Sequence, residues 1–230
     1  MENIKVYAFA TLLLVWLILT TCHYFRENRV SSFHIGTKFI ARVGIFGAIS
    51  AVLYIFIKFP VPIFPSFLEF HFDEVPIFIA GFAYGPLTAV FVTLVKTVIK
   101  LPLTSSMCVG ELCDLLYSLA FVVPASIIYK KHRTIKGALV GLGVGFVFQV
   151  IAALLGNIYI ILPFYMEVMG YSQEAILSWC QKANPAITDL GWTYGAVAVL
   201  PFNLIKNTIV VVLTFLIYKS TRKFIERIQR

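Results

Sequence analysis

Long apolar runs separated by short polar stretches dominate this sequence. A membrane-spanning helix needs about 20 apolar residues, and runs close to or above that length occupy residues 6–22, 41–57, 104–129, 137–163 and 192–218. Residues 75–103 add two shorter apolar segments, which are separated by "YGP" at 84–86. The pattern predicts an all-α membrane protein, in which a six-helix bundle follows one extra N-terminal transmembrane helix.

The first run, "VYAFATLLLVWLILTTC", has the length of either a signal sequence or a retained helix. It is followed by "HYFRENR" rather than by small residues that would mark a cleavage site. We therefore expect a retained helix. The predicted organisation is an extra N-terminal transmembrane helix at 1–25 and a six-helix membrane domain at 38–225.

The composition is that of a polytopic membrane protein, with 60% hydrophobic and 13% charged residues. The net charge of +8 could suggest a nucleic-acid partner, but most basic residues flank apolar runs, at 26–42, 130–136 and 219–230. Basic flanking segments face the cytoplasm in membrane proteins. The charge thus predicts a multi-pass protein of the cell membrane with a cytoplasmic C-terminal tail, residue 1 outside, and no nucleic-acid partner.

The loop at 58–76, "KFPVPIFPSFLEFHFDEVP", contains four prolines with phenylalanine, leucine and valine between them. Proline forbids a regular helix here, and the apolar side chains favour burial over exposure to water. We expect this loop to fold over the mouth of a cavity as a lid. Just beyond it, Lys96 and Lys100 are expected to extend toward the outer membrane interface.

Small residues recur at four-residue spacing on two predicted helices, which lets a neighbouring backbone approach closely. One set, Gly137, Gly141 and Gly145, indicates close packing. The other set admits two interpretations, packing within this chain or a docking face for another protein, and consists of Gly44, Gly47, Ala48 and Ala51.

Polar side chains interrupt the last apolar run at Asn203, Lys206 and Asn207. Their i, i+3 and i+4 spacing puts them on one helix face, and a lysine inside a membrane usually faces a cavity or a partner. This face could form hydrogen bonds with the polar edge of a ligand. Alternatively, Lys206 pairs with Glu111 or Asp114 to neutralise buried charge.

Two further polar features accompany this face. Asn157, near the outer end of the preceding run, is either a fourth ligand-facing group or a helix-end residue. Glu111 and Asp114 share one face near the start of a helix, where acidic residues also favour the helix dipole. With Lys206, they could form the relay of a proton-coupled carrier, which is a second possible function.

Several kinds of chemistry lack a signature in this sequence. The four cysteines form no CxxC pair, the four histidines are scattered, and neither pattern indicates a metal site. There is no phosphate-binding loop of the G-x-x-x-x-G-K-[ST] type, and no H-E-x-x-H or G-x-S-x-G motif. Binding or transport is favoured over catalysis, no cofactor is expected, and any ATP hydrolysis belongs to another protein.

Four stretches of the sequence together resemble a known family. They are "FPSFLEFHFDEVPIFIAGFAYGPLTAVFVTLVKTVIKLPLTSS", "VGELCDLL", "GNIYIILPFY" and "LPFNLIKN". They are similar to the substrate-binding S-component of energy-coupling factor vitamin transporters, most closely the riboflavin-specific type. The resemblance covers about residues 38–225. It implies a six-helix protein that binds its vitamin near the outer face, and it implies partners, a transmembrane coupling protein and two cytoplasmic ATPases.

The resemblance also implies roles for particular residues. Asn157, Asn203 and Lys206 match positions that contact the ligand, and the small residues of the first family helix match the docking face. A flat vitamin would also need an apolar slot, which Phe64, Phe67, Leu68 and Tyr165 could line.

The sequence departs from the family pattern in three ways. Asp114 replaces an expected asparagine, the loop at 164–190 is long, and the N-terminal helix is extra. These departures leave two vitamins open. Riboflavin fits the amides and the apolar slot, whereas a carboxylated vitamin such as pantothenate could use the Lys206 charge.

Overall fold

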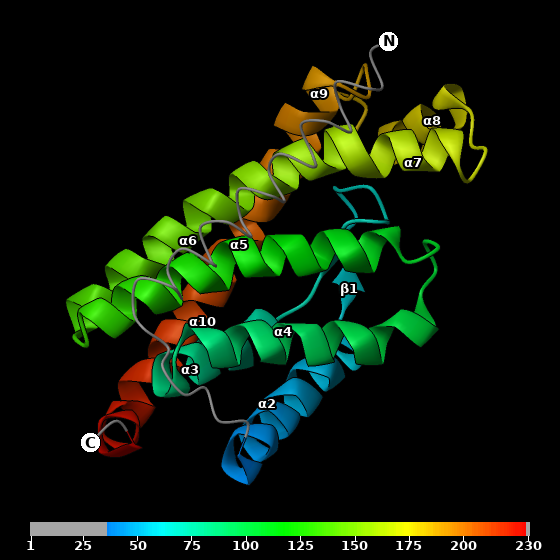
Figure 1. The fold of residues 1–230 in the computed structure, drawn as a ribbon. Coiled ribbons are helices and arrows are strands. Elements are labelled where there is room, and N and C mark those ends of the chain that lie inside the picture. Colours follow the sequence, from blue (N-terminus) through cyan, green and yellow to red (C-terminus); the bar gives the residue numbers. More distant parts are fainter. Residues whose placement is uncertain (1–35, 229–230) are drawn as a thin grey trace.

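Helices make up most of residues 36–228, the part of the chain that this computed structural model describes (Figure 1). The predicted helix at 6–22 lies outside the described residues. The helices are α2 (Thr37–Phe56), α3 (Glu74–Tyr84), α4 (Pro86–Lys100), η1 (Leu101–Leu103), α5 (Val109–Lys131), α6 (Ile135–Gly156), η2 (Asn157–Ile161), α7 (Leu162–Glu167), α8 (Gln173–Ala183), α9 (Trp192–Tyr194), η3 (Gly195–Val199) and α10 (Leu200–Ile228).

Five helical segments of the described chain are long and apolar enough to cross a membrane. Three of them are single elements or nearly so, and two are continuous runs in which a π-helical turn joins α-helices, α6–η2–α7 and α9–η3–α10. Helix α3 is also apolar but has only 11 residues, so it is not among these five. The molecule is therefore a multi-pass, all-α membrane protein. Its spans are Thr37–Phe56, Pro86–Leu103, Val109–Lys131, Ile135–Glu167 and Trp192–Arg227.

The predicted break at residues 84–86 is present. Helix α3 ends at Tyr84, and Gly85 takes a φ of +99°, a conformation that glycine adopts without a steric penalty. Pro86 then occupies the first position of α4, where its missing N–H is not needed. The reversal lets the short helix α3 lie inside the bundle and α4 return alongside it.

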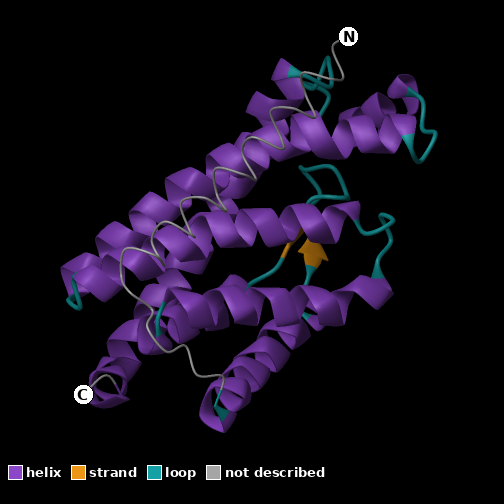
Figure 2. Cartoon of the chain, viewed as in Figure 1, coloured by secondary structure: helices purple, strands orange, loops and turns teal. Residues whose placement is uncertain are grey.

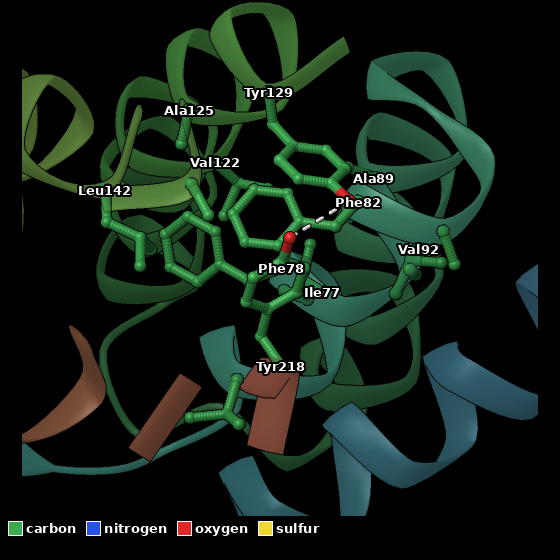
Figure 3. Close-up of a cluster of buried hydrophobic side chains, with 14 of the residues drawn as sticks. Ile77, Phe78, Phe82, Ala89, Val92, Val122, Ala125, Tyr129, Leu142 and Tyr218 are labelled. Carbon is green, nitrogen blue, oxygen red and sulfur yellow. Dashed lines mark hydrogen bonds between the residues drawn. The ribbon is translucent and has the colours of Figure 1, made fainter. Parts of the chain in front are cut away.

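Helix α3 lies at the centre of the larger apolar core (Figure 3). Phe78 packs edge-on against Phe121 of α5, with the ring centroids 4.7 Å apart. Phe82 packs against Tyr129 of α5 and Tyr218 of α10, whose hydroxyls lie 3.3 Å apart. Because nine of its eleven residues are buried, α3 contacts protein on almost all sides.

The predicted glycine stripe on α6 packs against α5. A Cβ atom added at Gly141 would lie 2.7 Å from the carbonyl oxygen of Ala125, and one added at Gly145 would lie 2.2 Å from that of Phe121. These distances are shorter than any Cβ contact can be, so the two backbones touch only because side chains are missing here. This close contact joins the two helices along their length.

Gly145→Ala is expected to lower the stability of the protein by about 1–3 kcal/mol, because the new methyl group overlaps a backbone atom that cannot rotate away. The matched control is Gly143→Ala on the same helix, where a Cβ atom meets nothing within 4 Å. Alanine is the better helix former, so the control should be neutral or stabilising. Thermal unfolding in detergent compares the two variants, and equal midpoints would contradict the packing described.

The four small residues of α2 separate into two pairs. Gly47 and Ala51 are buried, and a Cβ at Gly47 would lie 2.6 Å from Val95 of α4. Gly44 and Ala48 are exposed on the surface of the described chain. The packing interpretation therefore applies to the first pair, and only the second pair is available to a partner.

The segment at 164–190, expected to be a polar loop, is mostly ordered helix. It contains α7 and α8, and Ile176 and Cys180 of α8 are fully buried in a second apolar cluster. Burial raises the pKa of the Cys180 thiol to about 11, which leaves it protonated and unreactive. Asp189 then starts the last helical run by accepting a hydrogen bond from the N–H of Gly191, at 2.7 Å.

The predicted lid is a short hairpin. Strands β1 (Phe59–Pro60) and β2 (Glu69–Phe70) pair in antiparallel fashion, and Lys58 forms an ion pair with Glu69 beside them, at 2.8 Å. Phe64 and Phe70 pack on Phe202 of α10 within the second cluster. Figure 2 shows the hairpin toward the end of the bundle that carries α7 and α8, away from the C-terminus.

Candidate functional site

A cavity of about 270 Å³ lies beneath the hairpin, among α2, α5, α6 and α10. Of the nine candidate ligand-binding residues, eight line it. Phe64 is the exception, because it is buried behind the wall against Phe202. The eight lining residues are Phe67, Leu68, Glu111, Asp114, Asn157, Tyr165, Asn203 and Lys206.

One side of the cavity is apolar and aromatic. Phe67 of the hairpin loop meets Tyr165 of α7 edge-on, with ring centroids 6.0 Å apart, and Leu68 and Phe202 lie beside them. Phe67 and Tyr165 come from segments about 100 residues apart in the sequence. A flat ring system could be held between such groups with few changes of side-chain conformation.

Lys206 is held by two groups at the floor of the cavity. Its Nζ atom lies 3.2 Å from a carboxylate oxygen of Glu74 and 3.0 Å from Nε2 of His71. The alternative predicted that Lys206 pairs with Glu111 or Asp114. Lys206 does pair with a buried carboxylate, but that carboxylate is Glu74, so the predicted partners are wrong. The three residues thus do not form the direct relay expected of a proton-coupled carrier.

Lys96 is fully buried and does not reach the membrane interface, contrary to the sequence-based expectation. Its ammonium group contacts the carboxylate of Asp73 and lies 2.7 Å from that of Asp114 and 3.1 Å from the Ser118 hydroxyl. Charged groups at this depth are stable only when paired. Asp114, the departure from the family pattern, therefore has a structural partner of its own.

Lys100 is also largely buried, and it belongs to a second group around Glu111. The Glu111 carboxylate accepts hydrogen bonds from Thr104 at 2.7 Å and Ser106 at 3.1 Å, and Lys100 lies 3.8 Å away. At the start of helix α5, which begins at Val109, the N–H of Gly110 donates to the Ser106 hydroxyl at 3.0 Å. Glu111 lies in the first turn, where its charge suits the helix dipole, and its carboxylate also binds loop side chains near the cavity.

His71 connects the two lysines, a role that the scattered histidines of the sequence did not suggest. Because the Lys206 ammonium can only donate, Nε2 of His71 accepts, which places the ring proton on Nδ1. Nδ1 then donates to Asp73, which also binds Lys96. The segment "HFDE", which leads into α3, supplies three of these groups. Their partners come from α4 and α10, so the sequence of the segment alone does not reveal their role.

His71, Asp73 and Glu74 place potential ligand atoms within 4.8 Å of one another, a spacing that a metal ion could use. The ammonium groups of Lys96 and Lys206 already compensate these carboxylates. A further cation would sit beside two positive charges. The donor set therefore fits an ion-pair network better than a metal site.

The two asparagines of the cavity are fixed by the helices that carry them. Asn157, in the π-helical turn η2, donates to the carbonyl of Ala153 and accepts from the Tyr194 hydroxyl. Asn203 donates to the carbonyl of Val199 at 2.8 Å. Both side chains are nearly buried, and each retains one N–H and one lone pair for a ligand.

Gln149 of α6 is a cavity residue that the sequence reading missed. It lines the cavity and donates to Asn203 at 3.0 Å. Asn207, expected on the ligand face, is fully buried behind it and donates to Gln149. The only feature of the sequence that could have indicated this role is the presence of a polar glutamine within the glycine-rich apolar run at 137–156.

The fold and the cavity define a helical membrane protein that encloses a polar site between its spans. The chain matches the family described as "ECF transporter, substrate-specific component" over residues 38–218, and it belongs to that family. The family predicted from the sequence motifs is thereby confirmed.

Known relatives and a solved structure agree with this assignment. The chain is 28% identical to the riboflavin transporter RibU of Staphylococcus aureus (strain TCH60), covering 83% of this chain and 94% of that protein. It is 30% identical to the riboflavin transporter FmnP of Bacillus subtilis (strain 168), covering 83% and 95%. The solved S component of a bacterial ECF transporter matches with a TM-score of 0.65 at 26% identity, covering 81% and 96%.

Proposed function

We propose that this chain is the riboflavin-binding subunit of an energy-coupling factor importer. The observation that carries the proposal is the convergence of Asn157, Asn203 and Lys206 on one cavity that aromatic side chains also line. Riboflavin is an uncharged tricycle with a polar pyrimidine edge, which suits amides on one side and rings on the other. The two relatives above are riboflavin transporters by name.

The cavity favours riboflavin over a carboxylated vitamin. Lys206 is already paired with Glu74, so a ligand carboxylate would have to compete with a buried protein carboxylate for the same ammonium. Asp114 and Glu111 also line the cavity and would repel it. The volume, about 270 Å³, lies just below the range of about 300–1,000 Å³ for small-molecule sites.

In the proposed mechanism, the chain captures the vitamin from outside and acts with partners that hydrolyse ATP. The basic end of α10 and the hairpin lie toward opposite ends of the bundle (Figure 1). A cytoplasmic C-terminal tail therefore puts the cavity toward the outer face. The chain itself would not be an enzyme. A transmembrane coupling protein would contact the exposed face around Gly44 and Ala48, and its two ATPases would drive release inside.

The test is to purify the protein in detergent from cells grown with riboflavin and to record its absorbance. We expect flavin bands that are released on denaturation. Asn203→Ala and Lys206→Ala should each weaken riboflavin binding by about 10–100-fold, because each leaves polar groups of a buried site unpaired. The control is Lys219→Ala, on the same helix but exposed at a distance from the cavity.

A colourless protein that also leaves the fluorescence of added riboflavin unchanged would overturn the ligand assignment. A protein that binds riboflavin equally well in all three variants would keep the ligand and overturn the site. Both readings are made on folded protein, which size-exclusion chromatography of each variant establishes.

A further inference from the structure

Three buried amide side chains form a hydrogen-bonded series between α6 and α10. Asn207 donates to Oε1 of Gln149, and Nε2 of Gln149 donates to Oδ1 of Asn203 at 3.0 Å. Nδ2 of Asn203 donates to the carbonyl of Val199 at 2.8 Å. Gln149 and Asn203 line the cavity, whereas Asn207 lies behind them.

This series fixes which way the Asn203 amide points. If the amide were rotated by half a turn, its NH₂ group would face the NH₂ group of Gln149, and its oxygen would face the carbonyl of Val199. Both contacts would be repulsive. Gln149 itself is held in the same way, because its oxygen is used by Asn207.

The groups left over for a ligand follow from this inventory. Gln149 retains one N–H, Asn203 retains one lone pair on its oxygen and one N–H, and Lys206 adds an ammonium one turn further along the same face of α10. The wall therefore presents an acceptor on Asn203 with donors on both neighbours.

We propose that Gln149 determines specificity in this cavity by orienting Asn203 and by supplying its own N–H to the ligand. The matching chemical class is a cyclic imide, in which an N–H lies between two carbonyl groups. Riboflavin carries such an edge on its pyrimidine ring, so this inference rests on the proposed function and extends it to a residue and an edge.

The experiment compares riboflavin with 3-methylriboflavin, in which the imide N–H is replaced by N–CH₃. Binding to the purified protein is measured by quenching of flavin fluorescence, and selectivity is the ratio of the two dissociation constants. The unsubstituted protein should prefer riboflavin by at least about tenfold, since the methyl group blocks the hydrogen bond to Asn203.

Gln149→Met keeps the approximate shape of the side chain and removes its hydrogen bonds. It should reduce the selectivity ratio by about tenfold, because only the Val199 carbonyl then holds the Asn203 amide in its orientation. Asn207→Leu should reduce it in the same direction, although no atom of Asn207 lines the cavity. In an Asn203→Ala background, Gln149→Met should change the ratio little, as expected if it acts through Asn203.

The control is Thr214→Val, which removes a buried hydroxyl of α10 that makes no hydrogen bond within the described chain. Its selectivity should equal that of the unsubstituted protein.

If Gln149→Met and Asn207→Leu lower only the unfolding temperature and leave the ratio unchanged, the role of Gln149 is structural and the inference is overturned. The inference also fails, with the proposed function intact, if riboflavin binds but its methyl analogue binds equally well. If riboflavin does not bind the unsubstituted protein, both the proposed function and this inference are overturned.

Discussion

Lys96→Met is expected to destabilise the protein by about 3–5 kcal/mol, the largest loss of stability that we predict. The ammonium group of Lys96 is fully buried and bridges the carboxylates of Asp73 and Asp114. Removing it leaves two buried negative charges next to each other, and the neutral His71 ring beside them donates a hydrogen bond to Asp73 but adds no positive charge. Thermal unfolding in detergent measures the effect.

A double substitution and a matched control make this prediction specific. Lys96→Met combined with Asp114→Asn removes one of the two stranded charges and should recover part of the stability. Lys100→Met serves as the control, because its ammonium lies 3.8 Å from Glu111 and so contributes less. If Lys96→Met and Lys100→Met unfold at the same temperature, the bridging role of Lys96 is refuted.

Ala48→Leu is expected to abolish vitamin uptake by cells while riboflavin binding to the purified protein stays within about twofold of normal. Ala48 and Gly44 leave a shallow, exposed strip on α2 into which a partner helix could pack closely. A leucine side chain there would fill the strip without touching the cavity. Uptake in cells and binding in detergent are measured on the same variant.

Two further variants separate docking from folding. Gly143→Leu places a leucine side chain at an exposed position of α6, where a Cβ meets nothing within 4 Å, and should leave uptake intact. Gly47→Leu would collide with Val95 inside the chain and should lower stability as well as uptake. Should Ala48→Leu lose binding and uptake in parallel, docking and ligand capture would not be separate functions.

The sequence was most informative where a local rule applies. The spacing of apolar residues predicted the spans, because a bilayer requires helices of a certain length. "YGP" predicted the break between α3 and α4, because Gly85 takes a φ of +99° and proline suits the first position of a helix. The proline-rich stretch predicted an irregular segment, and the structure places it over the cavity as a hairpin.

Sequence spacing could place residues on one face, but it could not identify what that face meets. Asn203, Lys206 and Asn207 share a side of α10, yet the first two line the cavity and the third is buried against Gln149. The position of α6 decides this division, and no pattern within α10 contains it.

Pairing of charges was likewise a matter of tertiary structure. Lys96 and Lys206 lie 110 positions apart, and both bind the short segment at 71–74 because α4 and α10 approach it from different sides. A lysine near a predicted helix end suggests an interfacial position from its sequence alone. Burial costs favoured pairing instead, and the partners come from the start of α3 and from α5.

What the sequence by itself determined was the class of molecule: the helical bundle, its broken helix, the family and eight of the residues that line the cavity. Hydrophobic period, proline and glycine act over a few residues, so their effects can be read along the chain. The tertiary structure alone decided which small residues stay exposed, which carboxylate each lysine binds, and which amide orients Asn203. Those outcomes depend on contacts between helices, whose energies are set by distance and burial and not by separation in sequence.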